Sequence, residues 1–258
     1  MSILFEILAH KRNEVRERRA KGLARPGWDL PPLRSFRNAI TKGPGVAVIA
    51  EVKKASPSKG LICPDFNHLA IAGDYERGGA AAVSVLTDER FFQGDLMYLA
   101  EIRREIGLPL LRKDFIIDHF QVEEAVAWGA DAVLLIAAAL DDVLLSELMH
   151  HAKELGLDYL LEVHDEQELE RAMKAGADLL GVNNRNLADF SVSIETTFRL
   201  KRIVGDLVPI VSESGISSAG DMERLRTAKV SAALIGESIV KAEDRVARLE
   251  RFVAAGKG

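Results

Sequence analysis

The feature that most constrains the fold of this chain is a regular alternation of short apolar runs with amphipathic segments. Each run is nearly continuously apolar and rich in aliphatic and β-branched residues, which is typical of parallel strands buried on both faces. The eight runs cover residues 45–53, 81–87, 108–115, 131–138, 158–164, 179–184, 208–214 and 232–238. Their starts are roughly 20 to 35 residues apart, and this spacing is the size of one strand-and-helix unit.

The segments between the runs carry apolar residues at spacings of three and four, which indicates amphipathic helices. These segments are 66–80, 95–107, 119–130, 141–156, 165–177, 193–205 and 219–230. Several of them end in a glycine that suits a helix C-cap, such as Gly107, Gly129 and Gly156. The tripeptide Gly-Ala-Asp recurs at 129–131 and 176–178, as an echo of the repeated unit.

Eight such units predict an α/β fold, namely a closed (β/α)8 TIM barrel. The structural alternative is a doubly wound open sheet, which needs a glycine-rich dinucleotide turn that the segment 53–60 does not supply. We expect a single domain over residues 1–258, with the barrel in 45–258 and an N-terminal helical extension in 1–44. A proline-rich link at 26–32 divides this extension. Because the apolar face of the extension needs a partner, we expect it to fold over the mouth or rim of the barrel.

Composition and charge argue against several classes of function. The net charge of −5 argues against a nucleic-acid partner, because domains that bind nucleic acid usually carry a basic face. No apolar run is long enough for a membrane span and no signal-peptide pattern starts the chain, so we expect a cytoplasmic protein without a membrane partner. Cys63 is the only cysteine, and no cysteine or histidine spacing suits a metal site. We interpret Cys63, His119 and His164 as structural residues, and the adjacent His150 and His151 as solvated.

Polar residues at the ends of the predicted strands carry the chemistry, because the active site of a TIM barrel lies at the carboxyl ends of its strands. Glu51 and Lys53 are two residues apart, so they point to the same face of their strand. If that face is the barrel mouth, Lys113 and Glu162 converge on them in one apolar-walled cavity. Two lysines and two glutamates in such a cavity suit general acid–base catalysis. The alternative for each residue alone is an ion pair that holds the rim.

Two glycine-containing segments, 211–218 and 234–238, end the seventh and eighth predicted strands. TIM barrels often bind phosphate with these two loops through backbone N–H groups. Gly215 and Gly236 allow close approach of the backbone, and Ser56 can supply a hydroxyl group from the first loop. The alternative is that these glycines only form turns.

Apolar side chains follow several of the predicted strands at the mouth. They are Phe92, Phe115, Pro57 and Leu187. A wall of this kind suits an aromatic ligand, although each residue by itself is equally well explained by packing beneath the loops.

These residues together carry a family resemblance. The segment IAEVKKASPSKG (49–60) resembles the first-strand signature of the indole-3-glycerol-phosphate synthases, and this signature is highly specific. The segments LLRKDFI, LLEVH, GVNNRNL, SESGI and LIGES follow in the order of that family, at 110–116, 160–164, 181–187, 212–216 and 234–238. The resemblance spans the whole chain, including the N-terminal helix. The family often has serine where this chain has Glu237. With a glutamate at this position, only the backbone can donate a hydrogen bond to the phosphate there.

The resemblance implies a cofactor-free and metal-free ring closure in tryptophan biosynthesis. The implied substrate is a phosphosugar, 1-(2-carboxyphenylamino)-1-deoxyribulose 5-phosphate, and the products are indole-3-glycerol phosphate, CO2 and water. In this scheme Lys113 is similar to the general acid at the carbonyl, and Lys53 to the cation that holds the substrate carboxylate. Glu162 resembles the base for the later dehydration, and Glu51 the residue that orients the lysines and the substrate hydroxyls.

The resemblance also implies the binding residues. Asn183 and Ser214 look like substrate-positioning groups. Ser56, Gly215, Gly236 and Glu237 look like the phosphate site, with Arg185 as its support. The expected assembly is a monomer, with association with other tryptophan-pathway enzymes left open.

Two other functions compete with this interpretation. Phosphoribosylanthranilate isomerase is also a phosphate-binding barrel, but it uses a cysteine at the end of the first strand and an aspartate at the sixth. This chain has Glu51 and Lys53 at the first of those ends and Asn183 at the second. A non-catalytic phosphosugar-binding barrel would explain the two phosphate loops, but not Lys113 together with Glu162.

Overall fold

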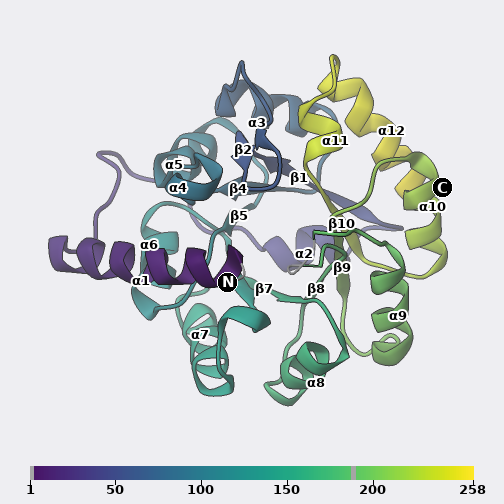
Figure 1. Cartoon of the computed structure of the whole chain (residues 1–258). Coiled ribbons are helices and arrows are strands. Elements are labelled where there is room, and N and C mark those ends of the chain that lie inside the picture. The colour runs from purple at the N-terminus through teal and green to yellow at the C-terminus, as the bar shows by residue number, and fades with distance from the viewer. Residues whose placement is uncertain (1–2, 187–189) are drawn as a thin grey trace.

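The computed structural model describes residues 3–186 and 190–258 of the chain. Its parallel strands close into a barrel in the order β1–β10–β9–β8–β7–β6–β5–β4 (Figure 1). These strands are β1 (Ala47–Val52), β4 (Ala82–Leu86), β5 (Leu110–Lys113), β6 (Ala132–Ile136), β7 (Asp158–Val163), β8 (Leu180–Asn183), β9 (Ile210–Glu213) and β10 (Ala232–Ile235). Each strand lies inside one of the predicted runs, so the predicted TIM barrel is confirmed.

Helices surround the barrel, and one of them follows each barrel strand along the chain. They are α3 (His68–Arg77), α5 (Leu96–Glu105), α6 (His119–Ala127), α7 (Asp142–Glu154), α8 (Glu166–Lys174), α9 (Glu195–Val204), α10 (Ala219–Thr227) and α12 (Arg245–Lys257). Most of them begin after an N-cap side chain that accepts a backbone N–H, because the first N–H groups of a helix lack partners within it. These caps are Asn67, Asp95, Asp118, Asp141, Asp165, Ser218 and Asp244.

Short elements follow the carboxyl ends of four strands and so surround the mouth. After β1 comes a hairpin of β2 (Ala55–Ser56) and β3 (Gly60–Leu61), and after β4 comes α4 (Glu89–Phe92). The remaining two are the 3-10 turn η1 (Ala137–Ala139) after β6 and α11 (Glu237–Val240) after β10.

Apolar side chains fill the barrel interior in register. One buried cluster combines Ile49, Leu111, Leu134, Leu160, Val211 and Leu234, each from a different strand. The alternate residues, such as Val48 and Leu110, belong to the larger cluster between the strands and the surrounding helices. Since side chains alternate along a strand, each interior residue fixes which later residue of its strand reaches the mouth.

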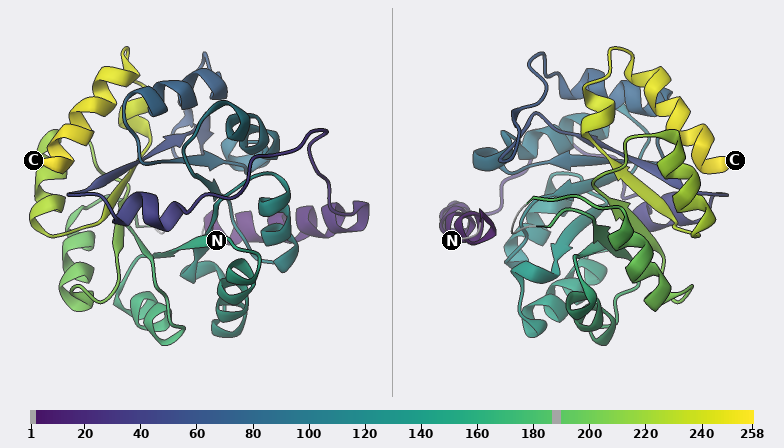
Figure 2. Two further views of the ribbon diagram at one scale, coloured as in Figure 1. Left: turned by 180° about the vertical axis from the view of Figure 1, so that it is seen from behind. Right: turned by 45° about the vertical axis from the view of Figure 1, so that its right-hand side comes forward.

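The N-terminal extension contacts both ends of the barrel. Helix α2 (Phe36–Thr41) packs Phe36 and Ile40 against the interior cluster, and the backbone N–H of Arg37 donates to Asp158 Oδ2 at the start of β7 (2.9 Å). Helix α1 (Ile3–Lys21) lies at the opposite end, where Ile7 lines the mouth. Figure 1 shows α1 in front of the barrel, and the left view of Figure 2 shows α2 on the other side. The extension therefore reaches the mouth, as expected, and also closes the far end.

A buried cation fixes α1 to the mouth. The side chain of Lys11 is fully buried, and its Nζ lies 2.7 Å from Asp88 Oδ2 and 2.9 Å from Asp114 Oδ1. Glu14 on the same helix is a third partner at 3.0 Å. A buried lysine needs such partners, because an unpaired charge in the interior is very costly. Lys11 thus joins α1 to the residues that follow β4 and β5.

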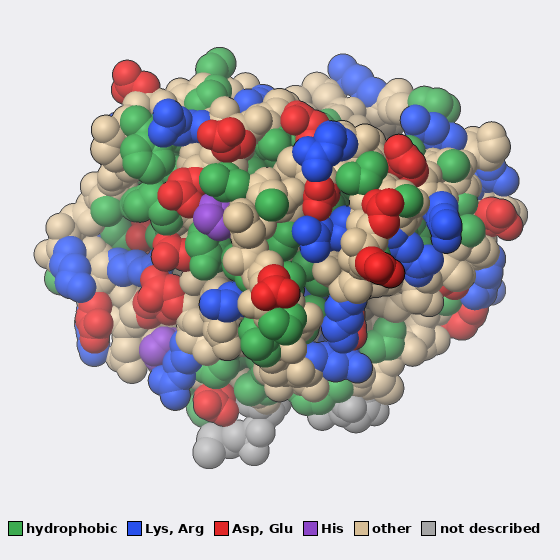
Figure 3. All heavy atoms as spheres, turned by 90° about the horizontal axis from the view of Figure 1, so that it is seen from above, with side chains coloured by type: hydrophobic (Ala, Val, Ile, Leu, Met, Phe, Trp, Pro, Cys, Tyr) green, Lys and Arg blue, Asp and Glu red, His purple; other side chains and the backbone are tan. Residues whose placement is uncertain are grey.

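Charged side chains of both signs are intermingled on the face shown in Figure 3. This distribution agrees with the modest net charge of −5. No helix within residues 3–186 and 190–258 has the length and apolar character that crossing a bilayer requires.

Candidate active site

The same two-residue spacing on five strands brings the residues of the candidate site together. Each of them follows an apolar interior residue by two positions, so it faces the same side of the sheet, one layer nearer the mouth. The pairs are Ile49 and Glu51, Leu111 and Lys113, Leu160 and Glu162, Val211 and Glu213, and Leu234 and Gly236. These residues line a cavity of about 1060 Å³ at the carboxyl ends of the strands.

Lys113 is held at the centre of this cavity by two carboxylates. Its Nζ donates to Glu162 Oε2 at 3.1 Å and to Glu213 Oε2 at 3.0 Å. The Lys113 side chain is 15% exposed, whereas the two glutamates are 4% and 2% exposed. All three residues line the cavity, and Lys113 is the most exposed member of this triad.

The three groups shift one another's pKa. Burial alone would lower the pKa of Lys113, but Glu162 and Glu213 outweigh it, so this pKa lies above its usual range. Burial alone would raise the pKa of Glu162, but Lys113 and His164 outweigh it, so this pKa lies below its usual range. Burial raises the pKa of Glu213 to about 7, since Lys113 opposes the rise only in part and Glu162 adds to it. Lys113 and Glu162 therefore stay ionised at neutral pH, while Glu213 titrates there.

A second lysine–glutamate pair lies on the other side of the mouth. Lys53 forms an ion pair with Glu51, and both side chains are mostly buried. Gly236 makes room for this pair, because a β-carbon at that position would collide with the Glu51 carboxylate. Gly181 does the same for Glu213. Both glycines therefore let carboxylates enter the barrel mouth.

Glu162 has two further neighbours. Asn183 Nδ2 donates to Glu162 Oε1 at 3.2 Å, and His164 Nε2 lies 3.3 Å from the same oxygen. The other ring nitrogen of His164 lies 2.9 Å from Glu168 Oε2. Burial alone would lower the pKa of His164, but the two glutamates raise it to about 10. A protonated His164 thus supports the negative charge of Glu162.

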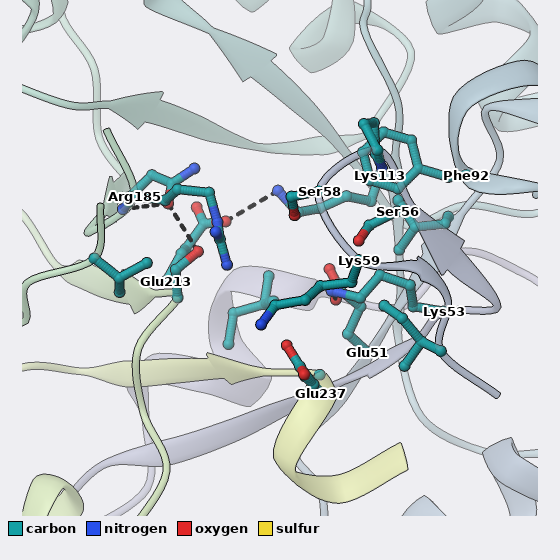
Figure 4. A pocket seen from close by; sticks show the side chains of 18 of the residues that line it. Glu51, Lys53, Ser56, Ser58, Lys59, Phe92, Lys113, Arg185, Glu213 and Glu237 are labelled. Atoms are coloured by element: carbon teal, nitrogen blue, oxygen red, sulfur yellow. Dashed lines mark hydrogen bonds and ion pairs between the residues drawn. The ribbon is translucent and has the colours of Figure 1, made fainter. Parts of the chain in front are cut away.

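The predicted phosphate residues line the rim of the cavity. They are Ser56, Gly215, Gly236 and Glu237, and the predicted support Arg185 and the predicted substrate-positioning residue Ser214 line it as well. Glu237 Oε1 accepts a hydrogen bond from Lys241 at 2.7 Å. Figure 4 shows Lys59, from the β2–β3 hairpin, pointing across the mouth toward Glu237. The rim therefore combines the backbone at two glycines with the cationic side chains of Lys59, Arg185 and Lys241.

An apolar wall faces these cations. Phe92 and Phe115 both line the cavity, with ring centroids 6.2 Å apart, and Pro57 closes the wall from the hairpin. Helix α1 adds Ile7 from the N-terminal extension. Leu187, the fourth predicted wall residue, lies outside the described residues.

The structure brings together all the predicted site residues that it describes, and it adds three. Glu213 shares Lys113 with Glu162, His164 touches Glu162, and Lys59 lines the mouth. A signal existed for two of them: His164 follows Glu162 by two residues, and Glu213 follows Val211 by two. Lys59 lies in an exposed hairpin, where no such periodicity applies. Within the described residues, no group of three or more His, Cys, Asp or Glu side chains has the arrangement of a metal site.

Comparison with known proteins decides the family. The family model described as indole-3-glycerol phosphate synthase matches residues 4–252. The chain belongs to the indole-3-glycerol phosphate synthase family. It is 54% identical to the indole-3-glycerol phosphate synthase of Desulfotalea psychrophila, over 93% of this chain and 94% of that protein. It is 44% identical to the protein of that name from Desulforamulus reducens, over 98% of each chain.

Solved structures show the shared barrel at much lower identity. A crystal structure of 3-hexulose-6-phosphate synthase has a TM-score of 0.67 at 15% identity, over 81% of this chain and 99% of that one. Thiamine phosphate pyrophosphorylase from Pyrococcus furiosus has a TM-score of 0.59 at 19% identity, over 81% and 95%. The family match makes this chain a decarboxylating lyase of tryptophan biosynthesis that acts on a phosphosugar-like substrate. It also decides against the isomerase and the non-catalytic barrel.

Proposed function

We propose that the mouth of this barrel converts 1-(2-carboxyphenylamino)-1-deoxyribulose 5-phosphate to indole-3-glycerol phosphate, CO2 and water. The observation that carries the proposal is the position of Lys113, between two carboxylates and beside an apolar wall. The substrate has an anionic phosphate at one end and a carboxylated aromatic ring at the other. The cavity has a glycine-lined, cationic sector and an apolar wall to match them.

Lys113 is the general acid of the ring closure. When the aromatic carbon attacks the carbonyl carbon, negative charge develops on the carbonyl oxygen, and a proton from Nζ neutralises it. Glu162 and Glu213 keep this ammonium protonated over the whole neutral range, since they raise its pKa against the effect of burial. An alkoxide is basic enough to take a proton even from such a lysine. Glu213, with its pKa of about 7, can then return a proton to Lys113.

Lys53 holds the substrate carboxylate until it leaves as CO2. Lys53 is paired with Glu51, so the two groups hold each other in position. Loss of CO2 returns the bonding electrons to the ring, and this step needs no external electron sink. Glu51 orients Lys53 and accepts hydrogen bonds from substrate hydroxyls.

Glu162 is the base of the final dehydration, in which it takes a proton from the ring while the hydroxyl leaves as water with a proton from the reprotonated Lys113. The pKa of Glu162 lies below the usual range, because Lys113 and His164 outweigh the effect of burial, so it is ionised and able to accept a proton. Asn183 fixes its second oxygen and so directs the carboxylate toward the cavity. Lys113 and Glu162 come from β5 and β7, and they approach the substrate from different directions.

The phosphate is bound by the backbone at Gly215 and Gly236, with the hydroxyl of Ser56 and the nearby Arg185. Ser214 and Asn183 position the sugar. Phe92, Phe115 and Pro57 enclose the aromatic ring, and we assign Leu187 to the same wall. Glu237 flanks the phosphate, and only its backbone takes part in binding.

A turnover assay tests the reaction, with indole fluorescence as the signal. We expect purified protein to form the fluorescent product from this substrate without added metal or cofactor. Absence of product from folded protein would contradict the proposed reaction.

Replacement of Glu162 by glutamine tests the division of labour. Glu162→Gln keeps the shape but cannot accept a proton at neutral pH, and its amide oxygen can replace only one of the two oxygens that accept from Lys113 and Asn183. In a single turnover we expect this variant to release CO2 while indole fluorescence lags behind, and we expect the wild type to give the two signals nearly together. Equal slowing of both signals would place Glu162 before or within the condensation.

We further propose that residues 1–258 act as one domain and as a monomer, in the cytoplasm. The support for this is that α1 and the barrel of one chain complete the mouth between them. Association with other tryptophan-pathway enzymes is compatible with this arrangement. Light scattering of the eluted protein measures the assembly, and a stable dimer at micromolar concentration would contradict the monomer.

A further inference from the structure

A buried asparagine connects the loops that follow β8 and β9. Asn184 is 3% exposed and follows Asn183, but it points away from the cavity toward α9. Its Nδ2 donates to Ser212 Oγ at 3.0 Å and to the backbone carbonyl of Ser214 at 2.9 Å. Its Oδ1 accepts from the backbone N–H and the hydroxyl of Thr197, at 3.1 and 2.9 Å. Every polar atom of this amide thus has a partner within the protein.

The carbonyl that Asn184 binds belongs to a strained residue. Ser214 has a φ of +66°, in the left-handed region that a residue with a β-carbon rarely adopts. The next residue, Gly215, continues in the same region with a φ of +79°. This pair of left-handed residues turns the chain into the cavity rim. A left-handed serine needs outside support, and two bonds provide it here: Asn184 holds its carbonyl, and Asn183 Oδ1 accepts from its hydroxyl at 2.9 Å.

We propose that Asn184 is a positioning residue that holds the Ser214–Gly215 turn in its phosphate-binding conformation. This inference rests on the proposed phosphate role of that turn, and it goes beyond it by naming the group that sets the geometry. Asn184 also donates its backbone N–H to the carbonyl of Glu213, at 2.9 Å. Asn184 therefore holds the end of β9 through its side chain and its backbone N–H, and it is not among the residues that line the cavity.

Thr197 supplies a matched control, because it belongs to the same buried network but not to the turn. Thr197→Val removes the hydroxyl bonds to Asn184 Oδ1 and to Ser212 Oγ, and it leaves the Asn184 bond to the Ser214 carbonyl in place. Asn184→Ala removes that bond as well. Both variants lose buried hydrogen bonds and should lose stability, and Asn184→Ala should lose more because it removes four bonds and Thr197→Val removes two. They differ in what happens to the turn.

The experiment compares the two variants in steady-state turnover, in inorganic phosphate binding and in crystal structures. For Asn184→Ala we expect KM and the phosphate Kd to rise about tenfold with kcat within about twofold of wild type, the pattern of lost uniform binding. We also expect the φ of Ser214 to leave the left-handed region. For Thr197→Val we expect KM and the phosphate Kd to stay within about twofold.

Other results would overturn the proposal. If Asn184→Ala keeps the left-handed Ser214 and binds substrate and phosphate like Thr197→Val, Asn184 is only a core residue. If Asn184→Ala does not fold, Asn184→Asp takes its place in the comparison with Thr197→Val. It keeps an oxygen for the Thr197 bonds and replaces only the NH2 group that binds Ser212 and Ser214. A wild-type protein that forms no indole-3-glycerol phosphate would refute the proposed function instead. The φ of Ser214 in Asn184→Ala would still decide the role of Asn184.

Discussion

Replacement of Lys113 by methionine gives the sharpest test of the acid role, because it keeps length and apolar character while it deletes the proton. We expect kcat to fall by at least about 100-fold, the usual contribution of a general acid. Lys53→Met is the matched variant, since Lys53 is a similarly buried lysine at the same mouth. We expect Lys53→Met to raise KM as well as lower kcat, because its proposed role is to bind the substrate carboxylate.

The structure also gives the cost of Lys113→Met to stability. The variant leaves Glu162 and Glu213, both almost fully buried, without the ammonium that lies 3.1 and 3.0 Å from them. Removing one partner of a buried ion pair costs about 3–5 kcal/mol. Protonation of Glu213 limits this cost, so we expect a loss of about 3 kcal/mol at pH 8, or roughly 6–12 °C in Tm for a chain of this size.

The sign of the pH dependence follows from Glu213. Burial raises its pKa from 4.5 to about 7 even with Lys113 present, and without Lys113 this pKa must rise further. A carboxyl group whose folded pKa exceeds its unfolded pKa contributes stability below the unfolded value, and this contribution is lost as the pH rises through the folded value. The variant should therefore recover stability relative to wild type between pH 8 and pH 5.

Activity and stability are measured separately, with indole formation at 25 °C and chemical unfolding at each pH. Retention of most of the wild-type kcat by folded Lys113→Met would show that Lys113 is structural. In that case the acid role would pass to Lys53. A deficit in unfolding free energy that stays constant from pH 5 to pH 8 would refute the argument about Glu213.

Two other parts of the site give measurable expectations. Inorganic phosphate should bind the rim at Gly215 and Gly236 and so raise Tm. At 100 times its Kd it should add about 2.7 kcal/mol to the free energy of unfolding. A crystal structure grown in phosphate with the anion elsewhere would contradict this. Lys11→Met should raise KM more than it lowers kcat, because it frees α1 from Asp114. Arg19→Ala, which removes an exposed α1 ion pair, should leave KM unchanged, and equal kinetics of the two variants would show that the buried contact does not matter.

The barrel was predictable from the sequence because buried parallel strands leave a strong local signal. Each strand is an apolar run, and the helices between the strands repeat the spacing of three and four. A local signal also indicated one pair of the candidate site, since Glu51 and Lys53 share a face by their spacing alone. The same rule of two residues places His164 above Glu162 and Glu213 above Val211. Glu213 also stands in the segment SESGI, which by itself indicates a phosphate loop.

Contacts between distant segments were not predictable in this way. The burial of Lys11 depends on Asp88 and Asp114, which lie after two different strands. A lysine on an N-terminal helix rich in charge gives no local sign of such a partner. The placement of α2 at the far end of the barrel depends in the same way on the contact between Arg37 and Asp158. These two residues lie far apart in the chain, so a single sequence does not show that they meet.

The pairing of charges at the mouth suggests to us how one site binds an anionic substrate and then releases its product. Lys53 is held by Glu51, and Lys113 is held by two glutamates, so both lysines already have an anionic partner. On our proposal, the substrate carboxylate exchanges with Glu51 for Lys53, and this exchange is favourable only while the carboxylate is present. Decarboxylation removes that anion, and Lys53 then returns to Glu51. The chemical step thus weakens the binding of its own product at one end, while the phosphate stays bound at the other until the dehydration by Glu162 is complete.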